Sequence, residues 1–265
     1  MAKKSSDRHS DRHYGGRGDP VRSMALLWRD DSAPAKGRGP KPGLTVDRIV
    51  AAAVEVADAE GLAALSMRRV AEKLGVGTMS LYTYVPSKAE LVDVMFDTIL
   101  GEIPRGEVEG GWRLRLEAIA RASWDHYRRH PWVLQVMAMS RPPLGPNSIA
   151  GYDHDLRAVD GIGLSELEMD SVLNLLHVFV QGAARTAIEA DASASDTGVT
   201  DLEWWETYAP LLAKVFDAEK YPVAARVGAV AGEVYQAAYD PEHGFRFGLV
   251  RLLDGIEVLV SSRRG

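Results

Sequence analysis

The sequence predicts an all-α protein, with an N-terminal three-helix, helix-turn-helix domain followed by a larger helical domain. Three observations support this prediction. Apolar residues recur at three- and four-residue spacing through most of the 265-residue chain, which is the pattern of helices with one buried face. No alternation of polar and apolar residues persists, so no strand is expected. Residues 66–88 have the spacing of two short helices joined by a glycine turn.

The composition is that of a soluble globular protein, with 46% hydrophobic and 26% charged residues. The chain has no cysteine, which excludes disulfides and thiol catalysis and fits a reducing compartment. The first twenty residues contain lysines but no apolar run, so no secretory signal is expected. The most apolar stretch, residues 172–184, is too short to span a bilayer. We therefore expect a cytoplasmic protein with no membrane partner.

Residues 1–43 are predicted to form a disordered basic arm. They contain ten Lys and Arg against five Asp and Glu, so the arm carries +5 and the rest of the chain −11. Glycine, serine and proline are frequent and the one apolar cluster is residues 24–28. The basic stretch 36–43 precedes the first predicted helix, where such arms can enter a DNA minor groove. A solvated linker with some attraction to phosphate is the alternative.

Helix-start residues and glycines mark the first elements. Residues 45–60 form a predicted helix that Thr45 caps and Gly61 ends, and this helix supports the motif that follows it. Residues 88–100 form another helix, which opens with a capping box beginning at Ser87. It joins the motif to the rest of the chain and is a natural lever between them.

Between these helices, the predicted helix-turn-helix has a cap, a crossing and a turn at the required spacing. Ser66 caps its first helix, small Ala71 lies where the helices cross, Gly75 makes the turn and Thr78 caps the second helix. The residues expected to point inward are Val70, Leu74, Leu81 and Tyr84. The alternative is an ordinary helical corner that does not bind DNA, because such a corner can have the same spacing of alanine and glycine.

The outward face of the second helix is short, uncharged and rich in hydroxyl and methyl groups. In a DNA-binding helix-turn-helix this helix enters the major groove, where hydroxyls bond to base edges and a thioether suits the thymine methyl. The residues expected to contact bases are Arg68, Thr78, Met79, Ser80 and Thr83. Those expected to contact the phosphate backbone are Ser66, Tyr82, Tyr84 and Lys88.

The segment 44–100 resembles the DNA-binding domain of the tetracycline-repressor (TetR) family. The string L-Y-x-Y-V-x-x-K-x-x-L, from Leu81 to Leu91, is a specific signature within it. The resemblance implies a DNA-binding domain over 44–100, including a fourth connecting helix. It also implies a homodimer that binds a double-stranded DNA operator and a small-molecule effector.

Residues 101–265 are predicted to form a helical ligand-binding and dimerisation domain. Glycine, proline and charge interrupt the helical pattern at 101–111, where we place the boundary. A flexible loop is expected at 191–199 and a short helix plus loop at 222–239. The other predicted helices span residues 112–130, 131–140, 148–159, 165–190, 202–216 and 245–261.

The last helix has an apolar stripe and two glycines, Gly248 and Gly255, one heptad apart. The glycines permit close approach of another helix. The stripe consists of Leu249, Leu252, Leu253, Ile256 and Val260. On these residues alone the helix is a core helix, whereas the resemblance implies a four-helix dimer interface formed with the long helix before it.

Three polar residues in the long apolar helix, Asn174, His177 and Gln181, lie near one face. Burying each without a partner would cost about 1–3 kcal/mol, so each should meet a polar group. An effector pocket or bonds to a partner subunit or ordered water would both serve. The tentative ligand site is Trp124, Tyr127, Asn174, His177, Gln181 and Trp205.

No cofactor, metal site or catalytic residue is predicted. His126 and His130 are four residues apart, so both could face one metal ion, but the sequence identifies no third ligand. No phosphate-binding loop, dinucleotide fingerprint, nucleophile elbow or zinc-protease motif is present, so the chain is not expected to be an enzyme. The magnesium-binding histidine of the tetracycline-binding family members does not align onto this chain, so tetracycline is not implied.

Together these features predict a ligand-responsive transcriptional repressor. It would bind a near-palindromic operator as a homodimer and be released by a small-molecule effector. The alternative is a helical small-molecule sensor or scaffold that does not bind DNA.

Overall fold

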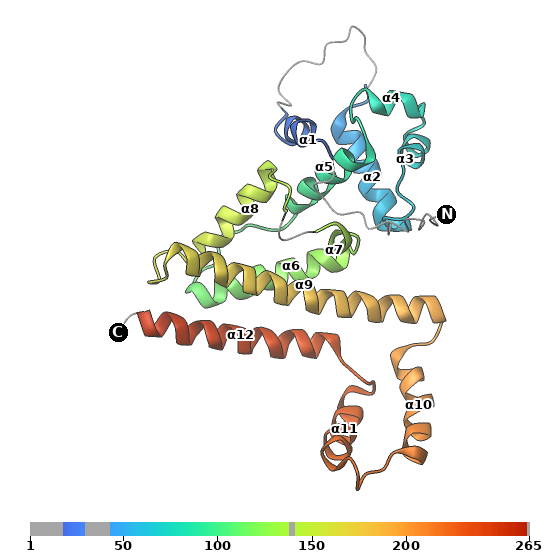
Figure 1. Cartoon of the computed structure of the whole chain (residues 1–265), viewed down its shortest axis with the longest axis vertical. Helices are drawn as coiled ribbons and strands as arrows, with labels where there is room; N and C mark the ends of the chain where they lie inside the picture. The colour runs from blue at the N-terminus through green and yellow to red at the C-terminus, as the bar shows by residue number, and fades with distance from the viewer. Residues whose placement is uncertain (1–17, 30–42, 138–140, 264–265) are drawn as a thin grey trace, which may run out of the picture. The chain divides into compact units, whose positions relative to one another are not determined.

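The computed structural model describes residues 18–29, 43–137 and 141–263. Those residues are helical with no strand, which confirms the all-α prediction. They form two compact units (Figure 1). Of the described residues, the first contains 18–29, 43–107, 129–137 and 141–157, and the second contains 108–128 and 158–263. No helix in the described residues is long and apolar enough to cross a membrane.

The first unit is built around α5. Its helices are α1 (Pro20–Leu27), α2 (Val46–Glu60), α3 (Met67–Leu74), α4 (Thr78–Tyr82), α5 (Lys88–Leu100), α7 (Val133–Val136) and α8 (Pro146–Arg157). Helix α5 contacts α1, α2, α7 and α8, while α3 packs on α2 and α4. The connecting helix therefore has four helical neighbours within this unit.

Caps set most helix ends of the first unit where the sequence predicts them. Thr45 accepts a bond from the Arg48 backbone at 3.2 Å, and Ser66 accepts one from Arg69 at 3.1 Å. Gly61 and Gly75 end α2 and α3 with φ of +79° and +68°. Only glycine adopts such angles readily.

Helix α4 begins differently from the prediction. Its N-cap is Gly77, which makes no side-chain bond, and Thr78 is the first helical residue. The Thr78 cap prediction is therefore wrong. Tyr84, expected inside, is 38% exposed, and Val85 is fully buried one residue later. Helix α4 has only five residues and ends before Tyr84. The residue that points inward after it is therefore Val85, one position later than predicted.

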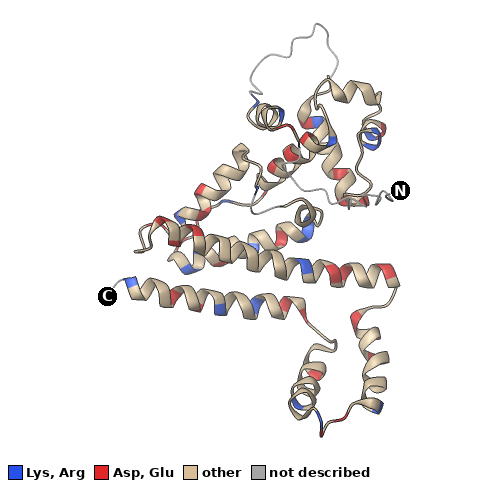
Figure 2. Cartoon of the chain, viewed as in Figure 1, with Lys and Arg blue, Asp and Glu red and all other residues tan. Residues whose placement is uncertain are grey.

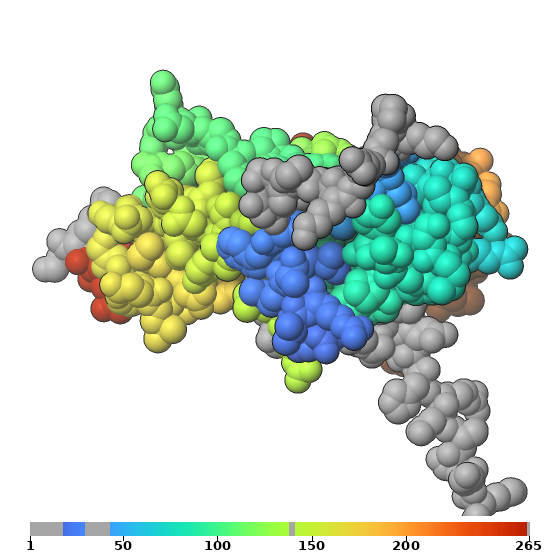
Figure 3. Space-filling view, turned by 90° about the horizontal axis from the view of Figure 1, so that it is seen from above, coloured from blue at the N-terminus to red at the C-terminus, as the bar shows by residue number. Residues whose placement is uncertain are grey.

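Helix α1 lies in the arm that was predicted to be disordered. Asp19 caps it through bonds from Val21 and Arg22, and Pro20 suits its first position. Leu27 is buried. The space-filling view shows α1, in blue, at the surface beside the teal residues of this unit (Figure 3). The prediction missed it because its contacts to α5 come from about 70 residues away. The basic stretch 36–43 falls almost wholly outside the described residues.

Three buried carboxylates make α5 a centre of polar contacts. Asp93 accepts from the Ser23 hydroxyl of α1 at 2.8 Å. Asp97 accepts from the Ser148 backbone at 2.8 Å and so holds the start of α8. Glu90 accepts from the Asp19 backbone at 3.0 Å. Buried carboxylates are costly unless hydrogen-bonded, so these bonds fix the segments around the connecting helix.

The second unit contains α6 (Trp112–Arg129, whose last residue falls in the first unit), α9 (Glu166–Thr197), α10 (Asp201–Val215), α11 (Pro222–Tyr235) and α12 (Pro241–Arg263). Helices α9 and α12 lie side by side (Figure 1). Phe245 stacks on Trp124 at 4.2 Å and on Phe179 at 6.0 Å between ring centroids. One aromatic stack therefore joins α6, α9 and α12.

Two helix lengths differ from the predictions. Helix α9 begins at its predicted capping box, Ser165 with Glu168, but continues through the expected loop at 191–199 as far as Thr197. Its last turns contain alanines, which favour helix, and Gly198 ends it with φ of +67°. The helix expected over 131–140 is only the four-residue α7, and residues 138–140 are outside the described part.

The stripe predicted for the dimer interface lies inside the chain. Leu249, Leu253, Ile256 and Val260 are at most 3% exposed on α12, which packs against α9 of the same chain. Only Leu252 is half-buried. Gly248 allows this packing, because a Cβ there would lie 2.5 Å from the Phe179 ring. These four residues are therefore core residues, which corrects the prediction.

Candidate DNA-binding surface, effector region and histidine cluster

The helix-turn-helix corner has a buried apolar core and a polar outer surface. Val70, Ala71 and Leu81 are at most 1% exposed, while Leu74 is half-buried. Gly75 makes the turn in the left-handed conformation. The core fixes the angle between α3 and α4, so the outward face of α4 is held in place without a partner.

Helix α4 contains no charged residue (Figure 2). Met79 is 77% exposed and Tyr82 is 42% exposed, and Ser80 and Thr83 are also exposed. Thr78 is half-buried at the helix start. The structure therefore brings the predicted base-contacting residues of this helix onto one short helix end.

The charged residues around α4 lie on its flanks. Arg68 forms an exposed ion pair with Glu72 at 2.8 Å. Arg69 bonds to Glu60 at 2.6 Å, and this hydrogen bond holds the pKa of Glu60 below its usual value. Ser66 is exposed, and Lys88 is half-buried at the start of α5. Arg68 must exchange Glu72 for DNA if it contacts a base.

The six residues of the tentative ligand site do not form one group. Trp124 and Tyr127 are buried on α6, and Trp124 belongs to the aromatic stack. Asn174 is exposed and donates to Asp170 of its own helix at 2.8 Å, so it does not point inward as predicted. The remaining three, His177, Gln181 and Trp205, are half-buried.

Trp205 belongs to a different contact from Trp124. Its ring lies against Gly232 of α11, where a Cβ would be only 2.5 Å from the indole. Sequence reasoning missed Phe179 and Phe245, the two rings that complete the stack with Trp124. Their aromatic character was visible in the sequence, but their meeting depends on the packing of α9 on α12.

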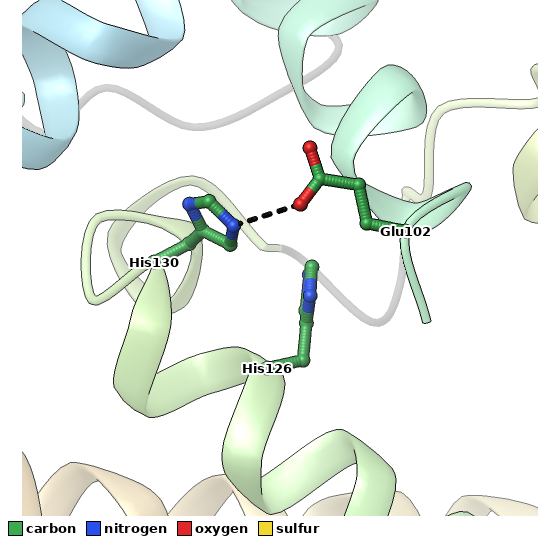
Figure 4. Close-up of side chains that lie close together, drawn as sticks. All are labelled: Glu102, His126 and His130. Carbon is green, nitrogen blue, oxygen red and sulfur yellow. Dashed lines mark hydrogen bonds and ion pairs between the residues drawn. The ribbon is translucent and has the colours of Figure 1, made fainter. Parts of the chain in front are cut away.

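His130, directly after α6, has an acidic partner that the sequence did not identify. Glu102 follows the end of α5, and its carboxylate lies 3.1 Å from Nε2 of His130 (Figure 4). His126 lies one helical turn before His130.

His130 is also bonded on its other side. Its Nδ1 is 2.8 Å from Oδ1 of Asp58 on α2, and Trp132 donates its indole N–H to the same oxygen at 2.7 Å. Both His130 and Trp132 are buried. Two carboxylates, one on α2 and one in the turn after α5, therefore face one imidazole.

Comparison with known proteins agrees with this architecture. The family described as "Bacterial regulatory proteins, tetR family" matches residues 49–95, and "Tetracyclin repressor-like, C-terminal domain" matches residues 104–260. A relative from Streptomyces coeruleorubidus, the HTH-type transcriptional repressor DrrR1, is 47% identical over 252 residues. The alignment covers 94% of this chain and 90% of DrrR1.

Solved structures show the same fold. The TetR family protein ActR of Streptomyces coelicolor, in complex with actinorhodin, has a TM-score of 0.67 and 30% identity. That match covers 81% of this chain and 96% of ActR. The ActR complex with (S)-DNPA gives a TM-score of 0.66, also at 30% identity, and covers 81% and 98% of the two chains. The extent of these matches shows that the chain belongs to the tetR family of bacterial regulatory proteins.

Proposed function

We propose that this protein is a ligand-responsive transcriptional repressor that binds a near-palindromic operator as a homodimer and is released by a small-molecule effector. The observation that carries the proposal is the exposed face of α4. Its closed core and its uncharged hydroxyl and thioether groups suit insertion into a major groove. The relative DrrR1 is named as a repressor, which supports the direction of regulation.

The roles of individual residues follow from their position on the corner. Thr78, Met79 and Ser80 lie on α4, and Thr83 is its C-cap. These four would contact base edges, and Arg68 would reach a guanine after leaving Glu72. The flanking residues would contact phosphates and fix the register without reading sequence. They are Ser66, Tyr82, Tyr84 and Lys88.

The dimer face is assigned to the side of α9 and α12 that their own packing leaves exposed. On α9, Leu175 and Val178 are 53% and 56% exposed. On α12, Val258 is 72% exposed. Gly255 has no atom within 4 Å of a Cβ position, so a helix of a second copy could approach it closely. Dimerisation would place two α4 helices about 34 Å apart, one DNA turn.

The effector site is placed beside the stack of Trp124, Phe245 and Phe179. Aromatic rings with a few polar groups nearby are typical of small-molecule sites, and His177 and Gln181 are half-buried on the same long helix. The ActR complexes with actinorhodin and (S)-DNPA support a small-molecule effector. A coupling free energy of about 1–3 kcal/mol between effector binding and operator binding would change operator affinity five- to 150-fold.

The test is selection of bound sequences from a random double-stranded DNA pool, with the purified full chain at two salt concentrations. We expect a near-palindrome whose affinity falls as salt rises. The selected operator is then titrated with the protein in the presence and absence of actinorhodin, as a first probe of effector response. Folded dimer that recovers no sequence above background, before and after refolding from denaturant to remove bound ligand, would overturn the proposal.

A further inference from the structure

His130 is a buried imidazole with an acidic group at each ring nitrogen. Its side chain is 6% exposed. Oδ1 of Asp58, in the last turn of α2, lies 2.8 Å from Nδ1. A carboxylate oxygen of Glu102, in the turn after α5, lies 3.1 Å from Nε2 (Figure 4). All three residues belong to the first unit, so this Asp58–His130–Glu102 bridge links the C-terminal ends of α2 and α5.

Both contacts of the bridge can be hydrogen bonds only if it holds one proton more than a neutral imidazole. A neutral ring donates from one nitrogen and accepts at the other, whereas an ionised carboxylate only accepts. If Nδ1–H donates to Asp58, a bare Nε2 would present its lone pair to the Glu102 oxygen. A second proton is therefore required on Nε2, and the ring is then an imidazolium between two carboxylates.

Loss of this second proton would release Glu102 rather than Asp58. The Asp58 oxygen also accepts the indole N–H of Trp132 at 2.7 Å, which keeps it directed at Nδ1. The Glu102 side chain is 46% exposed and can turn into water, where its charge is well solvated. Deprotonation would therefore free the turn after α5 and leave His130 attached to α2.

The charged groups around the ring come from three parts of the chain. Asp58 faces it from α2, and Glu102 faces it from the turn after α5. Helix α7, which follows, has the sequence VLQV and carries no charge. Along the chain, exposed Arg129 precedes His130, and His126 lies one helical turn earlier. A test must separate the charge of His130 from that of these groups.

We propose that His130 is a positioning residue for operator binding, which holds the end of α5 to α2 only while both ring nitrogens carry a proton. The inference rests on the proposed function, because α5 leads directly from the DNA-binding corner and its setting determines where α4 lies. Helices α2 and α5 also pack on each other, so loss of the bridge loosens their angle without separating them. Operator affinity should therefore fall as His130 loses its second proton.

The test compares the operator affinity of the wild type with that of Glu102→Gln between about pH 6 and pH 8.5. A glutamine amide can donate to the bare Nε2, so this variant keeps the contact when the ring is neutral. By fluorescence anisotropy, we expect the wild-type affinity to fall about two- to tenfold more than that of the variant, the value of one hydrogen bond. Histidines elsewhere, such as His9 and His13, are shared by both proteins, so their effect cancels. Glu107→Gln, at an exposed position of the same segment, is the matched control and should follow the wild type.

Nitrogen NMR of the His130 ring in the full chain measures the proton without DNA. We expect two protonated nitrogens in acid and loss of the Nε2 proton alone as the pH rises. A ring that keeps one proton, or two, throughout the range would overturn the proposal. Parallel pH profiles of operator affinity for the wild type and Glu102→Gln would also overturn it. A protein that binds no operator at any pH would instead refute the proposed function, and the NMR titration would still decide whether the bridge depends on the proton.

Discussion

The helix-turn-helix corner and the α10–α11 pair are both short helical hairpins, but they bury their apolar residues in opposite ways. In the corner, Val70, Ala71 and Leu81 are at most 1% exposed. In α10 no residue is buried, and in α11 only Gly232 is. The corner is therefore complete within one chain and presents polar groups outward. The α10–α11 pair presents apolar groups, with Val215 80% and Val234 69% exposed.

This difference indicates what each hairpin binds. A closed core with an outward hydroxyl surface suits a polar ligand such as DNA. A hairpin with an exposed apolar surface suits a protein, since large apolar patches on a single chain mark interaction sites. We assign the α10–α11 surface to a second copy of this chain, because the proposed dimer face on α9 and α12 belongs to the same unit.

The largest expected effect is at the closed core of the corner. Leu81→Ala should lower the free energy of unfolding by about 2–5 kcal/mol, because it leaves a cavity that close packing cannot fill. Leu211→Ala removes the same atoms from a residue of α10 that is 51% exposed. This substitution should change the free energy of unfolding by less than about 0.5 kcal/mol. Urea unfolding at a concentration where the protein is monomeric measures both. Equal losses would contradict the comparison.

The next effect concerns the α10–α11 surface. Replacing Leu211 and Val230 together by Asp should raise the dimer dissociation constant about 100-fold, or ~2.8 kcal/mol, because the charges must be desolvated at the interface. Monomer stability should hardly change. Ala213→Asp together with Ala224→Asp adds the same two charges at other exposed positions of α10 and α11 and is the control. Sedimentation equilibrium measures the dissociation constants. An unchanged constant for the double variant would show that α10 and α11 are not part of the dimer interface.

The sequence predicts the local features of both hairpins better than their long-range contacts. Ser66 and Gly75 are recognisable because capping and left-handed turns depend on neighbouring residues. The bond of Asp58 to His130 and the stack of Phe245 on Trp124 join residues 72 and 121 positions apart. No local pattern specifies such pairs. The apolar stripe of α12 differs, because its residues alone predict the core helix that the structure has, and its assignment to a dimer interface came from the family resemblance.

A smaller effect is expected on the polar surface of α4. Thr78→Val removes the hydroxyl and keeps the shape of the side chain. It should weaken binding to the selected operator by about 1–3 kcal/mol if the hydroxyl contacts a base, with little effect on random DNA. Lys88→Gln should weaken binding to both DNAs and reduce the salt slope by about 0.9. Fluorescence anisotropy at several salt concentrations distinguishes the effects of the two substitutions. If Thr78→Val lost equal affinity for the selected operator and for random DNA, Thr78 would contact the DNA backbone rather than a base.

The smallest effect concerns α1, which polar contacts rather than a deep core hold against α5. Burial opposes ionisation of Glu90, but hydrogen bonds from the Ser87 hydroxyl and the Asp19 backbone hold its pKa below its usual value of 4.5. A lowered pKa means that this carboxylate stabilises the fold above pH 4.5 and that the contribution is lost as pH falls through the folded-state pKa. Glu90→Gln should therefore lower the Tm at pH 7, and the difference from wild type should shrink in acid. Glu109→Gln, at an exposed position between α5 and α6, is the control and should show no such pH dependence. A Tm difference that stays constant from pH 7 down to a pH below the folded-state pKa would mean that the Glu90 contact stabilises α1 without its charge.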